Sequence, residues 1–318
     1  MVIAHGKTRS LPLCVLEKAT GHLQRRVARD VCSQPNLYTL LDHEDPLVRG
    51  LVRYNLSLRD RSPPTDSPTY ASLLELGRDP IDRETIEKTH TSSIDSEFAS
   101  ILHKLRSEED LSSDETEILI RFVTFSRFRT PAWKSIYYPE TRKRVQALVG
   151  PLLQDPRFIE YRLPFRGTII SAQQILEANL YQMAIIEAAE GTYNAIHRVQ
   201  AKVQLLHSLD DAFFVTSDNA ARPYMPDRVR RIPYEPLPGL KDPRVQITYP
   251  VGRRSCVLIS SETRVPLFAQ QEVKAKRVRR INSAIATAAV DQVVLPAPSR
   301  DFFEPWLDTF ALPPISRP

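Results

Sequence analysis

Apolar residues recur at helical spacing between residues 94 and 125 and predict two helices joined as a hairpin. The first stripe consists of Ile94, Phe98, Ile101, Leu102 and Leu105. The second stripe consists of Ile118, Phe122 and Phe125. Ser112 with Glu115 three residues later predicts a capping box at the start of the second helix, and Pro131 ends it. The short polar segment 107–111 allows only an antiparallel connection.

Two charged residues interrupt these apolar stripes. Asp95 lies seven residues before Leu102, and Arg129 lies seven residues after Phe122. At about 100° per residue, each charge falls within roughly 20° of a core position. We expect Asp95 and Arg129 to form a hydrogen-bonded pair, because either charge alone is costly to bury. An ion pair that ties the two helices together is the favoured interpretation, and presentation of Arg129 to a ligand is the alternative.

Helices dominate the first two thirds of the predicted structure, and strands follow. We expect helices over residues 23–31, 70–77, 82–90, 171–206 and 272–289, strands over 212–216, 245–249 and 255–260, and a short edge strand over 293–295. This order predicts an α+β fold, in which a mostly helical body packs on a small mixed or antiparallel sheet with a C-terminal helix.

A proline-rich segment, residues 59–68, is typical of an exposed linker. The sequence therefore predicts an N-terminal segment with this loop over residues 1–69 and a single α+β domain over 70–318. Within that domain, we expect a helical part over 70–206 and a sheet part over 207–318.

The apolar run 213–216 ends abruptly in three polar residues, Ser217, Asp218 and Asn219. The end of a strand is a common place for a site. Asp218 fits either a ligand-binding position beside arginines or a turn in which its carboxylate accepts backbone N–H groups; the turn is slightly favoured.

The net charge of +5 is concentrated in one region. Residues 219–282 contain 14 Lys and Arg against 5 Asp and Glu. This surplus permits an anionic ligand or a nucleic acid as partner, although solvated loops are the more common explanation. The cluster 274–280 has no interleaved aromatic residues, which favours a solvated helix face.

Several classes of protein are excluded by absent motifs. Glycine is scarce (9) and proline abundant (26), and neither a Walker nor a Rossmann fingerprint occurs. No GxSxG surrounds Ser217, and His207 is badly placed to act as its base. HExxH is absent, and the patch His43-Glu44-Asp45 fits a solvated turn better than a metal site. We expect neither metal nor cofactor, and whether the chain is an enzyme stays open.

Three cysteines without CxxC spacing favour reduced thiols. The sequence has no apolar run of membrane-spanning length and no signal-peptide core at its start. We therefore expect a soluble, cytoplasmic protein without membrane contact.

The order of six short motifs resembles the domain of unknown function 4238 family. The motifs lie at residues 36–38, 94–98, 125–131, 214–219, 247–250 and 280–282. The resemblance places Arg129, Thr130, Ser217, Asp218 and Asn282 at recurrent polar positions of the family, for which it supplies no established chemistry.

Three departures from the family pattern accompany the resemblance. Asp95 stands where the family usually has Glu, and Ala220 stands where it usually has Pro. The His-Tyr-Val-Pro segment that typically opens the family is not found. If its histidine is functional in relatives, this departure implies a truncated or inactive copy.

Two hypotheses follow from these residues. In the first, Arg129, Ser217, Asp218 and Asn282 line one polar cleft for a phosphate or another small anionic ligand, with Ser217 and Asp218 within about 10 Å of Arg129. In the second, the chain is a non-catalytic binding or interaction protein, and the same residues form a structural polar network.

Overall fold

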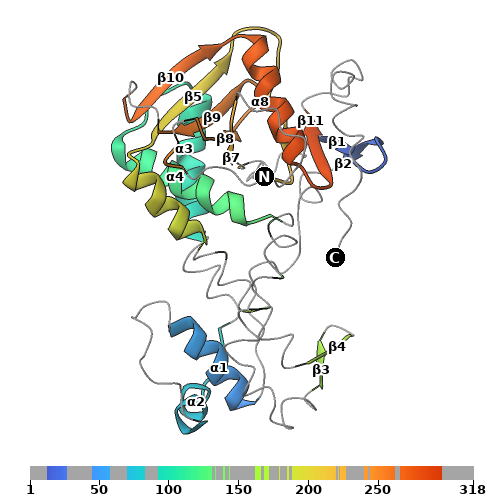
Figure 1. Ribbon diagram of the computed structural model, residues 1–318, viewed down its shortest axis with the longest axis vertical. Coiled ribbons are helices and arrows are strands. Elements are labelled where there is room, and N and C mark those ends of the chain that lie inside the picture. Colours follow the sequence, from blue (N-terminus) through green and yellow to red (C-terminus); the bar gives the residue numbers. More distant parts are fainter. Residues whose placement is uncertain are drawn as a thin grey trace. The chain divides into compact units, whose positions relative to one another are not determined.

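The computed structural model describes 180 of the 318 residues, in discontinuous stretches (Figure 1). These are residues 13–26, 45–57, 70–82, 92–130, 133, 139, 143, 162–165, 168–171, 179, 185, 188–219, 221, 223–226, 240–242, 244–261 and 266–295. The chain forms two compact units: the first comprises Met1–Pro35, Ile94–Trp133 and Ala189–Pro318, and the second comprises Asn36–Ser93 and Lys134–Ala188. The proline-rich segment 59–68, and with it the predicted boundary at residue 69, lies outside the described residues.

The described part of the second unit includes two helices and a hairpin. The helices are α1 (Pro46–Ser57) and α2 (Tyr70–Leu76), and the hairpin strands are β3 (Arg162–Phe165) and β4 (Thr168–Ser171). Gly50 lies directly against the backbone of Leu73, so that a Cβ atom at this position would overlap the carbonyl group of Leu73. The missing side chain at Gly50 therefore allows α1 and α2 to approach closely.

The first unit contains a five-stranded sheet in the order β10-β5-β9-β8-β7. Its strands are β5 (Lys202–Ser208), β7 (Pro223–Tyr224), β8 (Gln246–Pro250), β9 (Ser255–Ser260) and β10 (Phe268–Val273). β10 runs parallel to β5, and the other neighbouring strands are antiparallel. The prediction of an α+β fold with a mixed sheet is confirmed.

Each face of this sheet contributes to a separate hydrophobic core. On one face, Val203, Leu205 and Val257 pack with α3 (Ser92–Arg106), α4 (Ser113–Phe128) and the helical residues 188–198. On the other face, Leu206 and Leu258 pack against α8 (Ala275–Ala288), which lies beside the sheet in Figure 1. Alternation of side chains along the central strands therefore separates the α3–α4 hairpin from α8.

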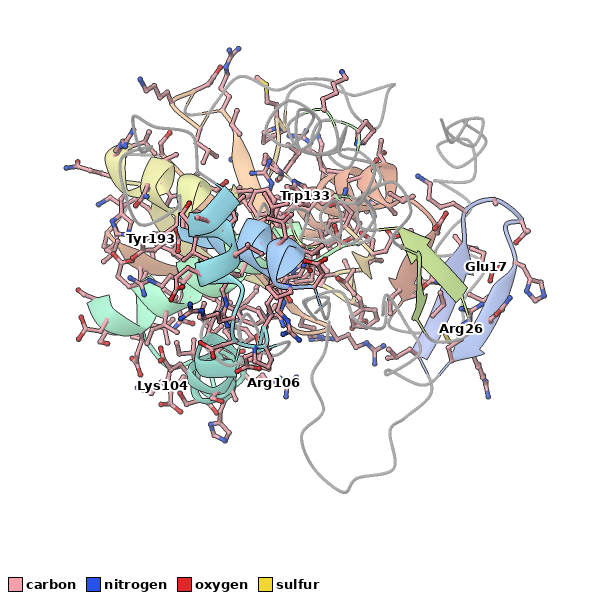
Figure 2. All side chains as sticks on the ribbon, turned by 90° about the horizontal axis from the view of Figure 1, so that it is seen from below. Glu17, Arg26, Lys104, Arg106, Trp133 and Tyr193 are labelled. Carbon is pink, nitrogen blue, oxygen red and sulfur yellow. The ribbon has the colours of Figure 1, made fainter. Side chains whose placement is uncertain are left out.

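A second, antiparallel sheet continues the core of α8. Its order is β2 (Leu23–Arg26), β1 (Leu13–Glu17), β11 (Gln292–Leu295) and β6 (Thr216–Ser217). The Arg26 guanidinium lies 2.7 Å from the Glu17 carboxylate across the β1–β2 hairpin. Both residues are labelled on this hairpin in Figure 2. The sheet joins residues from both ends of the chain to the segment that leads to the predicted site.

The second helix of the hairpin starts with the predicted capping box, and aromatic rings stack between the two helices. Ser112 and Glu115 form the capping box, each side chain bonding the backbone N–H of the other residue. The rings of Phe98 and Phe122 stack with their centroids 3.5 Å apart and their planes 5° from parallel. Both apolar stripes therefore meet at the interface between α3 and α4.

Several predicted boundaries need correction. The helix expected over residues 171–206 does not extend to residue 206, because Lys202–Ser208 form β5, which lies between β10 and β9 in the sheet. The expected helix over 23–31 begins with a strand, Leu23–Arg26, and the C-terminal helix starts at Ala275 rather than at 272, because Phe268–Val273 form β10. Of the strand expected over 212–216, only Thr216 pairs in a sheet. A strand buried on both faces is apolar at most positions, and its spacing then also fits a helix.

Candidate functional site

Asp95 and Arg129 form a bidentate ion pair between the two helices of the hairpin. The Arg129 guanidinium donates to both carboxylate oxygens of Asp95, at 2.6 Å to Oδ1 and 2.9 Å to Oδ2. Asp95 lies in the first turn of α3, and Arg129 is the C-cap residue of α4, so the antiparallel hairpin brings them together. Their side chains are 24% and 16% exposed, which leaves the pair largely screened from water.

The ion pair borders the core on the α3–α4 face of the five-stranded sheet. Tyr249 of β8 belongs to this core, and burial raises the pKa of its hydroxyl. A hydrogen bond with Ser126 and the charge of Arg129 lower the pKa, while the charge of Asp95 raises it. Thr130 follows the pair, and its hydroxyl accepts the backbone N–H of Trp133 at 3.2 Å. Thr130 therefore stabilises the turn after α4.

Asp218 binds the backbone of the turn that connects α8 to β11. Its carboxylate accepts N–H groups from Val290 at 2.9 Å, Asp291 at 2.7 Å and Gln292 at 3.2 Å. The residue is 5% exposed, and burial raises the pKa of its carboxyl even though the three N–H groups act in the opposite direction. The Asp218 side chain therefore stabilises this turn, as the slightly favoured interpretation predicted.

Asn282 connects α8 to the irregular segment that precedes β6. Its Oδ1 accepts the N–H of Val215 at 3.0 Å, and its Nδ2 donates to the carbonyl of Phe213 at 2.7 Å. Among the described residues, none forms a strand with 213–215, so the amide supplies bonds that a neighbouring strand would otherwise provide. Asn282 is 1% exposed.

Ser217 and Asn219 complete the same network. The Ser217 hydroxyl accepts the N–H of Asn219 at 3.1 Å, and the Asn219 amide donates to the carbonyl of Ala288 at 2.9 Å. With Asp218 and Asn282, these residues tie segment 213–219 to α8 and to β11. We call these four residues the polar network. Asn219 was part of the polar run in the sequence but was not assigned to the candidate site.

The polar network lies in the core that contains α8, whereas the Asp95–Arg129 pair borders the core of α3 and α4. Within the described stretches, the hydrogen bonds of Ser217, Asp218 and Asn282 go to backbone groups of segments 213–219 and 290–292. A common ligand for Arg129, Ser217, Asp218 and Asn282 stays a prediction.

His207, a candidate general base, is hydrogen-bonded, and Cys256, a candidate nucleophile, is buried. His207 of β5 bonds Gln270 at 3.0 Å and lies 3.6 Å from Glu108, on the side of the sheet that faces the α3–α4 hairpin. Burial raises the pKa of the Cys256 thiol, which disfavours a thiolate nucleophile. Among the described residues, no three His, Cys, Asp or Glu side chains gather to hold a metal ion. His43 and Glu44 lie outside these residues.

The match to a family model decides the relationship that the motifs indicated. The model for a protein of unknown function, DUF4238, matches residues 11–296. The chain belongs to the DUF4238 family. No curated protein and no solved structure matches the chain. In the described part of this DUF4238 protein, the helices are too short or too polar to cross a membrane.

One further feature of this DUF4238 protein is the charge on α8. Its exposed cationic side chains are Lys276, Arg279 and Arg280, and Lys274 at the N-cap is also exposed. We call these four residues the basic face of α8. The helix contains no Asp or Glu, and none of the four cations forms an ion pair within the described residues.

Proposed function

We propose that this chain is a non-catalytic binding protein whose basic face on α8 binds the phosphate backbone of a nucleic acid. The observation that carries the proposal is the set of exposed cations without carboxylate partners along one helix. Phosphate groups are the dense, regularly spaced anions that such a row of cations neutralises, with release of counterions.

The position of these cations is unfavourable for the stability of the helix itself. Lys274 and Lys276 lie at the N-cap and in the first turn of α8, where the positive end of the helix dipole disfavours further positive charge. Lys276 also lies three and four residues from Arg279 and Arg280, and like charges at these spacings repel. A function that needs positive charge at this place explains why the sequence retains it.

Nearby carboxylates do not neutralise the basic face. Asp210 accepts the backbone N–H of Ala275 at 2.8 Å and so caps the first turn of α8. Asp211 pairs with Arg254 at 2.8 Å, and Glu272 is exposed on β10. The four cationic side chains of the basic face are therefore available to bind an external anion.

A second cationic element lies next to α8. The guanidinium of Arg253 stacks over the ring of Phe213 at 3.7 Å from its centroid. Phe213 in turn is joined to α8 by the hydrogen bond from Asn282. Arg253, in the turn between β8 and β9, therefore extends the positive surface beyond the helix.

The polar network supports a binding role over catalysis. Asp218 and Asn282 direct their polar atoms to backbone groups, and a general base or nucleophile needs a free atom within reach of substrate. The network fixes segment 213–219 against α8, which holds the helix that carries the basic face.

The test is binding of a fluorescein-labelled 20-base-pair DNA duplex, measured by anisotropy in low salt. The triple variant Lys274→Gln, Lys276→Gln, Arg279→Gln should bind at least tenfold more weakly than the unaltered chain. A matched control removes three exposed cations elsewhere, Arg25→Gln, Arg106→Gln and Arg198→Gln, and should bind nearly as the unaltered chain does. Equal losses in both triple variants would show that only net charge matters, and would contradict the proposal.

The alternative function is handling of a small anionic ligand by Arg129 together with Ser217, Asp218 and Asn282. Partial exposure of the Arg129 guanidinium favours it. Thermal shift with inorganic phosphate tests this alternative. Stabilisation that is lost in Arg129→Gln but retained in Asp95→Asn would support it, whereas no stabilisation of the unaltered chain would exclude phosphate.

A further inference from the structure

One end of the α8-facing side of the five-stranded sheet is polar where an apolar surface is expected. The strand register places one residue from each of four neighbouring strands side by side, and these are Tyr224, Gln246, Ser260 and Lys202. Directly paired residues point to the same face of a sheet. Tyr224 packs in the core of α8, which identifies the face. We call these four residues the polar row.

Gln204 extends the polar row along β5. It pairs with Leu258 of the α8 core, and Ser260 is its diagonal neighbour two residues farther along β9. Diagonal neighbours lie about 7–8 Å apart, within reach of a long side chain or of one small ligand. The row and Gln204 thus form a continuous polar surface on rigid strands.

Two atoms of this surface lack a hydrogen-bond partner. Gln204 and Ser260 are each 3% exposed, and neither Oε1 of Gln204 nor Oγ of Ser260 has a partner. Buried polar atoms are satisfied in most proteins, so a pair of unsatisfied atoms on one surface indicates a bound group. Lys202 and Gln246 flank Ser260 on both sides and are partly exposed, so solvent reaches the row at these two positions.

Two arginines of α8 bring positive charge to the same place. Arg277 donates to Gln271 of β10 at 2.9 Å, and Gln271 pairs with Leu206, two residues from Gln204. The Tyr224 hydroxyl donates to Gln246 at 3.0 Å. Burial raises the pKa of this hydroxyl, and the charges of Arg277 and Arg280 oppose the increase. Both guanidinium groups therefore lie close enough to the polar row to act on it.

We propose that the polar row, with Gln204, Arg277 and Arg280, binds a small phosphorylated molecule that also carries N–H donors. The phosphate is held by the two arginines and Lys202. An N–H of the ligand fills the empty acceptor of Gln204, and Ser260 donates to or accepts from the ligand. A glutamine amide can pair with both N6 and N7 of adenine, so AMP combines the two required features.

This site shares Arg280 with the basic face of α8, and its other residues lie outside that face. Its contacts come from the sheet and from Arg277 and Arg280, whereas the triple variant of the basic face alters Lys274, Lys276 and Arg279. The two proposals can therefore fail separately. The triple variant should bind AMP as the unaltered chain does.

The experiment measures the thermal shift and the calorimetric binding of AMP, with adenosine and inorganic phosphate as partial ligands. AMP should raise the Tm of the unaltered chain more than either partial ligand does. Gln204→Met and Ser260→Ala should each weaken AMP binding at least fivefold. Their ligand-free Tm should stay equal or rise, because each replacement removes an unsatisfied polar atom.

A matched control is Ser255→Ala, which removes a hydroxyl from the other end of β9 and should leave AMP binding unchanged. The circular dichroism spectrum of each variant checks its fold, and Ser260→Ala serves if Gln204→Met does not fold. The proposal is overturned if AMP fails to bind the unaltered chain, if binding survives in both variants, or if phosphate alone binds as well as AMP.

Discussion

At the scale of single residues, the pair of Asp95 and Arg129 is the clearest electrostatic contact of the first unit. Replacing Arg129 by Met leaves the Asp95 carboxylate without its bidentate donor, and we expect a loss of about 1–3 kcal/mol in the free energy of unfolding. The double variant Asp95→Leu, Arg129→Met should lose less than the two single variants together. Urea unfolding of the full double-mutant cycle measures this coupling, and additive losses would show that the contact contributes nothing.

Asp218 gives a second residue-scale prediction, which concerns pH. Burial raises the pKa of its carboxyl in the folded chain above the unfolded value. Its stabilising contribution is therefore fully present below the unfolded pKa and decreases as pH rises through the folded pKa. Relative to Asp218→Asn, the unaltered chain should lose stability as pH increases from about 4. Urea unfolding of both proteins from pH 4 to 7 tests this, and a constant difference would contradict a raised pKa.

Residue-scale prediction from sequence succeeded where spacing carries the information. Seven-residue intervals placed Asp95 and Arg129 near core positions, and the two side chains do form an ion pair. The bonds of Asn282 have no such signal, because its partners at 213 and 215 are distant in sequence and unpaired in any strand. Gln204 was overlooked because the apolar run around it was assigned to a helix.

At the scale of elements, α8 is stable through its buried face and not through its charges. Lys276→Glu places a negative charge in the first turn and removes repulsion with Arg279 and Arg280. We expect stability to increase by about 0.3–1 kcal/mol, while binding of the DNA duplex weakens. Lys276→Gln separates charge removal from charge reversal and should show a smaller effect on both. A variant that becomes less stable would mean that the cations support the fold.

The contact between α1 and α2 allows an equally direct test. Gly50→Ala introduces a methyl group into the backbone of Leu73 and should destabilise by about 1–3 kcal/mol. Gly191→Ala is the control, because a Cβ there meets nothing within 4 Å and the residue is exposed in a helix. That change should stabilise by about 0.5–1 kcal/mol. Thermal or urea unfolding of the two variants gives the comparison, and similar behaviour would contradict close packing at Gly50.

The sequence predicted the class of fold better than the first and last residues of the helices and strands. The α3–α4 hairpin has amphipathic stripes and a capping box, and both signals are local. β5 and β10 are adjacent and parallel although their starts, Lys202 and Phe268, are 66 positions apart, so only tertiary pairing reveals them. The four-stranded sheet likewise depends on β1 and β11 meeting from opposite ends of the chain.

At the scale of the whole molecule, the modest net charge conceals an uneven distribution. The surplus of cations over residues 219–282 includes the basic face of α8 and the arginines of the β8–β9 turn. Both belong to the first unit, where the polar network holds the intervening segment in place. We propose that this surface binds nucleic acid through its phosphates.

The most direct test is the salt dependence of duplex binding, measured as the slope of log Kobs against log salt concentration. Each phosphate contact contributes about 0.9 to this slope for duplex DNA. If Lys274, Lys276 and Arg279 contact phosphates, their triple Gln variant should have a slope smaller in magnitude by about 2–3, and the Arg25, Arg106 and Arg198 control should keep the slope of the unaltered chain. An unchanged slope in the first variant would contradict binding through the basic face of α8.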